Sequence, residues 1–228
     1  MLLKDRTAIV HGASGSIGSA IARAFAREGA VVHLTGRTLS TLEEVATGIR
    51  NHGGEARVAE LDAVDRDAVE RHAAQAAEQC GGIDICFNAT NNDDIQGTPL
   101  LEIRVGDVVQ PVAKAVTSTF TVATAAARHM DGRGVILAMG GGREAIPNLG
   151  GLCRQLAAEL GPQGIRVAWL LSPGSPDASE ADPEADALLL PRRPSYDQVA
   201  NAAVYAASDW AATMTATEIN LTGGAVVD

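Results

Sequence analysis

The chain has 228 residues and a formal net charge of −10, from 18 basic and 28 acidic side chains. This length suits one domain, residues 1–228, with a sizeable core, and the acidic balance argues against a general nucleic-acid surface. No apolar run approaches the roughly 20 residues that a membrane helix needs, and a strand pattern begins too early to leave room for a signal peptide. Cys80, Cys86 and Cys153 have neither metal-ligand nor disulfide spacing, so we interpret them as small buried hydrophobes. We therefore expect a cytoplasmic protein in a reducing compartment.

Strand and helix patterns alternate along the chain. Apolar, β-branched runs predict strands at 7–10, 30–35, 56–61, 83–87, 135–139, 165–170 and 218–221. Helical spacing predicts helices at 17–29, from Thr38 or Ser40 to 53, and at 65–80, 104–130, 149–160 and 195–208, with Pro111 leaving the start of the fourth open. Residues 172–194 predict a loop over a site. The alternation predicts a three-layer, doubly wound α/β Rossmann fold with a seven-stranded parallel sheet, binding its ligand at the carboxyl ends of the strands.

A turn of small residues lies between the first expected strand and the first helix. It reads His11-Gly12-Ala13-Ser14-Gly15-Ser16-Ile17-Gly18. Small residues let the backbone approach a pyrophosphate, and the N–H groups and dipole of the following helix favour its negative charge. Because the glycines follow a strand and open a helix, the context favours a dinucleotide site over a tight turn that merely happens to be small.

The end of the second strand bears on which dinucleotide is bound. An acid there would bind the ribose 2′-hydroxyl of NAD, but the sequence reads Thr35-Gly36-Arg37. A guanidinium can bind a 2′-phosphate in a bidentate fashion. The alternative is that Arg37 is a solvated loop charge. We predict NADP(H) in preference to NAD(H).

Several motifs together resemble the short-chain dehydrogenase/reductase family over nearly the whole chain. The first turn resembles that family's TGxxxGIG motif, with His11 for Thr and Ser16 for the middle Gly. The other matching segments are Leu61-Asp62, Asn88-Ala89 with Thr90 in place of a glycine, residues 161–167, Pro173-Gly174, and residues 208–224. The resemblance implies a cofactor site made of Gly12, Ser14, Gly15, Ser16, Ile17, Gly18, Arg37, Asp62, Asn88, Ala89, Pro173 and Gly174. It also implies an oxidoreductase acting on a small carbonyl or hydroxyl substrate, assembled as a homodimer or homotetramer.

The catalytic residues of that family are not found. A Tyr supplies the proton there, and a Lys four residues later lowers its pKa. In this chain the residues four positions after Tyr196 and Tyr205 are Ala200 and Asp209, and the only lysines are Lys4 and Lys114. The positions of the family's Ser, Asn and Tyr fall on Gly140 or Gly141, near Ala115, and near Gly142. The segment that normally separates the fifth strand from the next helix is missing, so either the chain is a shortened relative or the printed sequence omits residues. We assign no catalytic residue.

Substitute groups are few. Lys114 could face the cleft or be a solvated charge, and Asn91-Asn92-Asp93-Asp94 could bind substrate or form a polar turn. Arg143 and Glu144 are possible substrate contacts. We interpret the five histidines as structural or exposed and not as metal ligands, and the two tryptophans as core or interface residues. The histidines are His11, His33, His52, His72 and His129, and the tryptophans are Trp169 and Trp210.

Two functions follow from these observations. The first is an NADP(H)-dependent oxidoreductase with an atypical active site, and the second is a non-catalytic nucleotide-binding or assembly protein with the same fold. The phosphate turn and Arg37 fit both, whereas the missing Tyr–Lys pair favours the second. The small-residue face Val122, Ala125, Ala126 and His129 suits either a subunit interface or the core.

Overall fold

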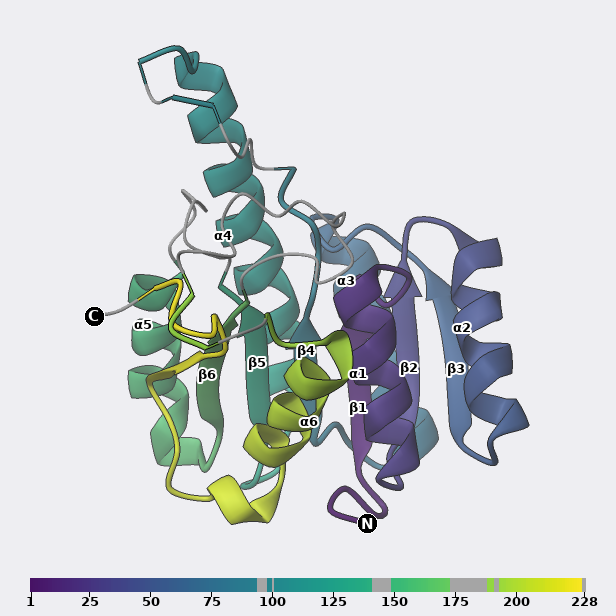
Figure 1. Ribbon diagram of the computed structural model, residues 1–228. Helices are drawn as coiled ribbons and strands as arrows, with labels where there is room; N and C mark the ends of the chain where they lie inside the picture. The colour runs from purple at the N-terminus through teal and green to yellow at the C-terminus, as the bar shows by residue number, and fades with distance from the viewer. Residues whose placement is uncertain (94–97, 100, 141–148, 173–187, 191–192, 227–228) are drawn as a thin grey trace.

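The computed structural model describes residues 1–93, 98–99, 101–140, 149–172, 188–190 and 193–226. Seven strands form one parallel sheet in the order β3-β2-β1-β4-β5-β6-β7 (Figure 1). The strands are β1 (Thr7–His11), β2 (Val31–Gly36), β3 (Glu55–Glu60), β4 (Ile85–Asn88), β5 (Val135–Met139), β6 (Arg166–Leu171) and β7 (Thr217–Asn220). The helices are α1 (Ser16–Arg27), α2 (Leu39–Asn51), α3 (Arg66–Cys80), α4 (Val105–Ala127), α5 (Gly150–Leu160) and α6 (Tyr196–Ala207), with short 3₁₀ helices at Gly161–Gln163 and Asp209–Ala211.

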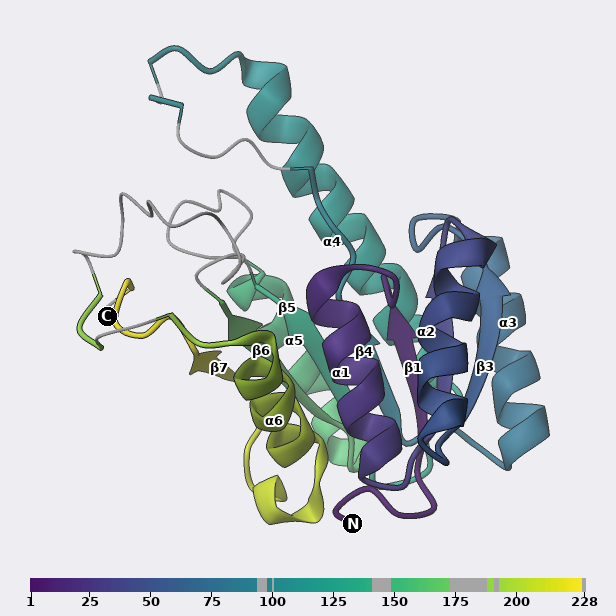
Figure 2. The ribbon, with the colours of Figure 1, turned by 45° about the vertical axis from the view of Figure 1, so that its right-hand side comes forward.

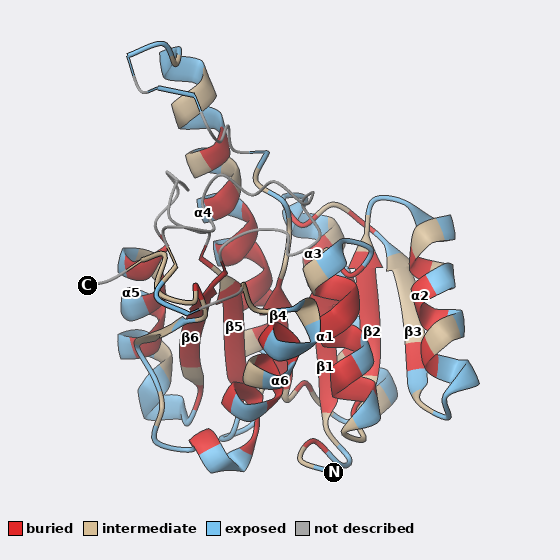
Figure 3. Cartoon of the chain, viewed as in Figure 1, coloured by how far each residue is buried: buried red, intermediate tan, exposed pale blue. Residues whose placement is uncertain are grey.

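Helices cover both faces of the sheet, because successive strand residues point to opposite sides and both sets are apolar. In β4, Ile85 and Phe87 pack in a cluster with α1, α2 and α6, whereas Cys86 between them packs with α3, α4 and α5. The sheet is consequently buried between the two helical layers (Figure 3). The predicted three-layer doubly wound fold is confirmed.

Backbone hydrogen bonds correct several predicted boundaries by a few residues. The fourth strand begins at Ile85 and not at Ile83, because the N–H of Ile83 donates to the carbonyl of His129, outside the sheet. The first helix ends at Arg27 and not at Gly29, because the φ of +92° at Gly29 is incompatible with a right-handed helix. Thr38 occupies the N-cap of α2, but its side chain makes no capping bond.

The fourth helix continues through Pro111, which lies near its start. A proline removes one hydrogen bond and strains the preceding turn, and in this helix the flanking residues still retain helical geometry. The amino-terminal part of α4 extends beyond the carboxyl ends of the strands (Figures 1 and 2). Val122, Ala125 and Ala126 are buried against the sheet, so their face belongs to the core rather than to an interface.

Two further expectations are corrected by burial. Cys86 and Cys153 are buried as predicted, but Cys80, at the end of α3, is only half-buried. Trp169 is buried and donates from Nε1 to Glu218 Oε2 at 2.7 Å. Trp210 is 74% exposed, which excludes it from the core and leaves the interface interpretation as a prediction.

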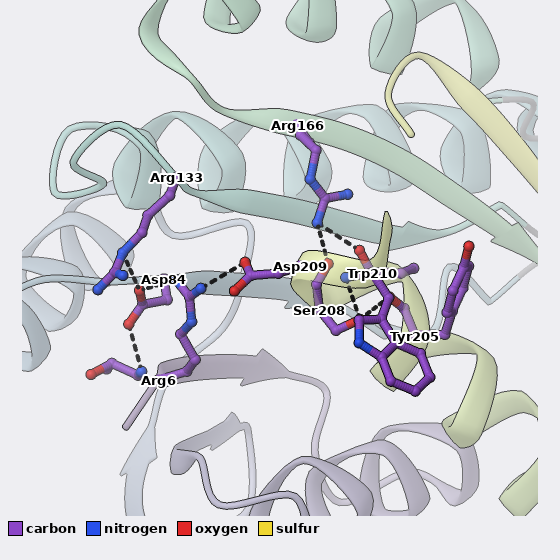
Figure 4. Close-up of polar contacts among 10 residues, drawn as sticks. Arg6, Asp84, Arg133, Arg166, Tyr205, Ser208, Asp209 and Trp210 are labelled. Atoms are coloured by element: carbon purple, nitrogen blue, oxygen red, sulfur yellow. Dashed lines mark hydrogen bonds and ion pairs between the residues drawn. The ribbon is translucent and has the colours of Figure 1, made fainter. Parts of the chain in front are cut away.

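A polar network stabilises the amino-terminal edge of the sheet, opposite the expected ligand site (Figure 4). Asp84 accepts hydrogen bonds from Arg6 Nη1 at 2.9 Å and from the backbone N–H of Thr7 at 2.8 Å. Arg6 also donates to Asp209 at 2.8 Å. These hydrogen bonds connect the amino-terminal ends of β1 and β4 to the segment after α6. In the described part of the chain, no helix combines the length and the apolar character needed to cross a membrane.

Candidate functional site

A cavity of about 230 Å³ opens at the carboxyl ends of the central strands. Its walls come from the turn after β1, from the last two residues of β2, and from the residues that follow β2, β3 and β4, together with one side chain of α4. The lining residues are Gly12, Ser14, Gly15, Thr35, Gly36, Arg37, Leu61, Asp62, Ala63, Ala89, Thr90, Asn91 and Lys114. This is the edge at which open α/β sheets bind their ligands.

The turn after β1 depends on glycine at two positions. Gly12 has a φ of +75°, and a Cβ there would lie 2.5 Å from the carbonyl oxygen of Ala89, which follows β4. A Cβ on Gly18 would lie 2.2 Å from the carbonyl oxygen of Gly12. The small residues therefore let α1 and the segment after β4 approach the turn closely.

The amino terminus of α1 is open to an anion. Among the described residues, no side chain caps this helix, and its first turn contains no acid. The N–H groups of the first turn have no partner within a helix, so those of Ser16, Ile17 and Gly18 remain available at the positive end of the dipole. By contrast, the amino terminus of α3 is capped by Asp65. The turn therefore has the features of a phosphate site.

His11 stabilises the turn after β1 through a buried contact with β2. Its Nδ1 lies 2.8 Å from Thr35 Oγ1, and both side chains are buried. Burial, with a smaller effect from the charge of His72, lowers the pKa of His11 to about 3, so its ring is neutral at physiological pH. The backbone carbonyl of Thr35 also accepts hydrogen bonds from the N–H groups of Gly12 and Ala13. His11 thus fixes the turn to β2 and carries no charge toward a ligand.

Arg37 and Asp62 lie at the end of the cavity formed by β2 and β3. Arg37 directly follows β2 and is exposed to solvent along one wall of the cavity. Asp62 follows β3, and its Oδ1 accepts from the N–H of Val64 at 3.2 Å. The structure therefore brings both predicted residues to the same cavity as the glycine turn.

Asn88, the last residue of β4, and the two residues that follow it lie partly in the core and partly at the cavity. Ala89 lines the cavity, whereas the buried Asn88 donates from Nδ2 to Thr119 Oγ1 at 2.9 Å and accepts at Oδ1 from Thr90 Oγ1 at 2.8 Å. Asn88 consequently ties this turn to α4, and its side chain does not line the cavity. Thr90, which stands where the family motif has glycine, is accommodated by this bond and lines the cavity itself.

The remaining candidates are distributed over several regions. Pro173, Gly174, Arg143 and Glu144 lie outside the described residues. Ala115, near the family's Asn position, is buried, and Lys114 beside it lines the cavity and pairs with Asp93. In the described part of the chain, no group of three His, Cys, Asp or Glu side chains is arranged to hold a metal.

Leu61 and Ala63 line the cavity but were not singled out from the sequence as cofactor residues. Both flank Asp62 directly after β3. Ligands of parallel sheets contact the residues that follow each strand, so the position of Leu61 and Ala63 directly after a predicted strand could have identified them from the sequence.

Comparison with known proteins identifies the family. The family model described as enoyl-(acyl carrier protein) reductase matches residues 12–226. The chain belongs to the short-chain dehydrogenase/reductase family. L-rhamnose 1-dehydrogenase (NAD(P)(+)) of Azotobacter vinelandii is 32% identical over 261 residues, which cover 100% of this chain and 99% of the relative. D-threitol dehydrogenase of Mycolicibacterium smegmatis is 29% identical and covers 97% of this chain and 93% of its own.

Solved structures of the family have the same fold. A dehydrogenase/reductase from Sinorhizobium meliloti has a TM-score of 0.88 at 27% identity, covering 99% of this chain and 96% of that one. A short-chain dehydrogenase from Burkholderia cenocepacia, solved in complex with NADP, has a TM-score of 0.85 at 27% identity, with 99% of both chains covered. The alignment with the rhamnose dehydrogenase is longer than the 228 residues of this chain, so that family member contains internal segments that this one lacks.

Proposed function

We propose that this short-chain dehydrogenase/reductase binds NADP(H) in preference to NAD(H). The observation that carries the proposal is the position of Arg37, which lines the same cavity as Gly12, Ser14 and Asp62. The open amino terminus of α1 would hold the diphosphate, and Arg37 would hold the 2′-phosphate. The similar Burkholderia structure that contains NADP supports this choice.

The affinity for the two nucleotides tests the proposal. Fluorescence titration of the wild-type protein should give tighter binding of NADPH than of NADH. Arg37→Ala should remove the preference, because a hydrogen-bonded charge contributes about 1.5–3 kcal/mol, or roughly 10- to 150-fold in affinity. Arg104→Ala is a matched control, because Arg104 is exposed near the start of α4 and does not line the cavity. Equal affinities in the wild type, or an unchanged preference in Arg37→Ala, would refute the assignment.

The proposed reaction is oxidation or reduction of a small hydroxyl or carbonyl substrate. The nicotinamide would supply or accept the hydride, and the chain would bind and orient the nucleotide. The relatives named as L-rhamnose and D-threitol dehydrogenases support a small polyhydroxylated substrate. We assign no side chain as proton donor, because the sequence has no Tyr followed four residues later by Lys. The active site is therefore atypical for the family.

The second candidate is a nucleotide-binding protein without catalysis, and the missing Tyr–Lys pair is the observation that favours it. Absorbance of NADPH at its nicotinamide band, followed with ketones, aldehydes and quinones, separates the two. The reverse reaction is followed with NADP⁺, L-rhamnose and D-threitol. Turnover with any substrate would eliminate the non-catalytic candidate. Tight NADPH binding with no turnover across the panel would favour it.

We further propose a homodimer or homotetramer in the cytoplasm. Exposed apolar side chains on α4, including Val109, Val116 and Phe120, support a subunit contact, as does the exposed Trp210. The three cysteine thiols are free, which supports a reducing compartment. Light scattering after size-exclusion chromatography tests the assembly, and a monomer at micromolar concentration would refute it.

A further inference from the structure

Lys114 contributes a second positive charge to the cavity. Among the described residues of α4, it is the one that lines this space, together with Arg37 after β2 and Asp62 after β3. Its side chain is 24% exposed, less than the 61% of its ion-pair partner Asp93, so most of the lysine side chain is covered by protein. This covered position differs from that of a fully solvated surface lysine.

Asp93 is the counter-ion of Lys114. Nζ of Lys114 donates a hydrogen bond to Asp93 Oδ2. This bond lowers the pKa of Asp93, and the charges of Lys114 and Arg37 lower it further. Asp93 therefore lies in the field of both cations. It has a φ of +59°, a backbone region that few non-glycine residues adopt, and its N–H donates to Asn91 Oδ1 at 2.9 Å.

Among the described residues that line the cavity, or that pair with one that does, positive and negative charges balance in the free protein. Two cations, Arg37 and Lys114, stand beside two carboxylates, Asp62 and Asp93. A phosphate monoester brings a further charge of about −1.5 to −2, in a chain whose net charge is already −10. While Lys114 is paired with Asp93, Arg37 is the one unpaired cation among the described cavity residues that could face this phosphate, and Asp62 lies nearby. Release of Lys114 from the exposed Asp93 would place a second positive charge beside the phosphate.

We propose that Lys114 and Arg37 together form the 2′-phosphate site. In the free protein the carboxylate of Asp93 is paired with the ammonium of Lys114, and the 2′-phosphate of the nucleotide displaces this carboxylate. This inference rests on the proposed binding of NADP(H) and makes Lys114 a specificity-determining residue. Asp93 competes with the phosphate for one ammonium group. Removing the carboxylate should therefore strengthen NADPH binding, whereas removing the ammonium should weaken it, and neither change should affect NADH.

Nucleotide binding in five variants tests the inference. Affinities for NADPH and NADH are measured by fluorescence titration, and those for adenosine 2′,5′-bisphosphate and 5′-AMP by calorimetry, all at low salt. Lys114→Met should weaken NADPH and the bisphosphate about tenfold and leave NADH and 5′-AMP unchanged. Asp93→Asn should tighten NADPH and the bisphosphate severalfold. Lys4→Met and Asp131→Asn are matched controls, because they make the same changes of charge at exposed residues that line neither this cavity nor the neighbouring pocket of Asp93 and Lys114. Both controls should bind as the wild type does.

The outcomes separate the inference from the proposed function. A wild-type protein that binds neither NADPH nor NADH refutes both. A wild-type protein that prefers NADPH, with Lys114→Met weakening NADPH and NADH equally or leaving both unchanged, refutes only the role of Lys114. An unchanged or weaker NADPH affinity in Asp93→Asn refutes the competition. Lys114→Arg, which retains the charge, should restore most of the preference, and far-UV circular dichroism confirms that each variant is folded.

Discussion

Three buried histidines should make the stability of this protein strongly dependent on pH. His11, His33 and His72 come from β1, β2 and α3, and the rings of His33 and His72 are 5.7 Å apart. Burial is the main reason that the pKa falls to about 3 for His11 and to about 4 for His33 and His72. Nδ1 of His72 is buried and has no hydrogen-bond partner among the described residues. Protonation of these rings is therefore strongly disfavoured in the folded state.

The direction of the pH effect follows from the lowered values. In the unfolded chain a histidine binds its proton near pH 6.5, so the unfolded state takes up protons before the folded state does. The stability is fully present above pH 6.5 and is lost as the pH falls toward 4. Between pH 8 and pH 5 each of these histidines lowers the free energy of unfolding by about 2 kcal/mol, and the three together lower it by up to about 6 kcal/mol. This is a large part of the roughly 5–15 kcal/mol that stabilises a domain.

Urea unfolding at pH 8 and pH 5 measures this loss, with the fluorescence of the buried Trp169 as the signal. His72→Leu should reduce the loss by about 2 kcal/mol, because it removes one of the three titrating groups. His52→Leu is the matched control, because His52 lies exposed after α2. A loss below about 1 kcal/mol in the wild type, or the same loss in His72→Leu, would show that these histidines do not determine the acid stability.

Three further variants probe other parts of the chain. Gly18→Ala should abolish NADPH binding in a folded protein, because its Cβ would lie 2.2 Å from the carbonyl oxygen of Gly12, whereas Gly48→Ala, where a Cβ meets nothing within 4 Å, should bind normally and gain about 1 kcal/mol in urea unfolding. Asp84→Ala should lose about 2–3 kcal/mol in the same assay, because it leaves Arg6 Nη1 and the backbone N–H of Thr7 without an acceptor and Arg6 with Asp209 as its remaining counter-ion, and a loss below about 0.5 kcal/mol would contradict this. Phe120→Lys should shift the light-scattering mass toward the monomer, and an unchanged mass would exclude this face of α4 from the interface.

The order of the elements and the position of the phosphate turn could be predicted from the sequence. Both depend on local patterns: β-branched runs, helical spacing, and glycines between a strand and a helix. The predicted ends of the helices and strands were less accurate, because hydrogen bonds to distant segments determine where an element begins and ends. The bond from Ile83 to the carbonyl of His129, for example, delays the start of β4.

Only the tertiary structure decided which side chains meet in the cavity. In the sequence Arg37 and Asp62 are predicted cofactor residues, but Lys114 has an equally available interpretation as a solvated charge, and nothing places it beside them. The parallel sheet brings the ends of β2 and β3 to one edge, and α4 places Lys114 there as well. The burial of His72 and the exposure of Trp210 were likewise inaccessible, because the packing of distant segments determines which residues water reaches. Local sequence patterns determined the order of the elements, and long-range packing determined which charged side chains meet and which residues are exposed.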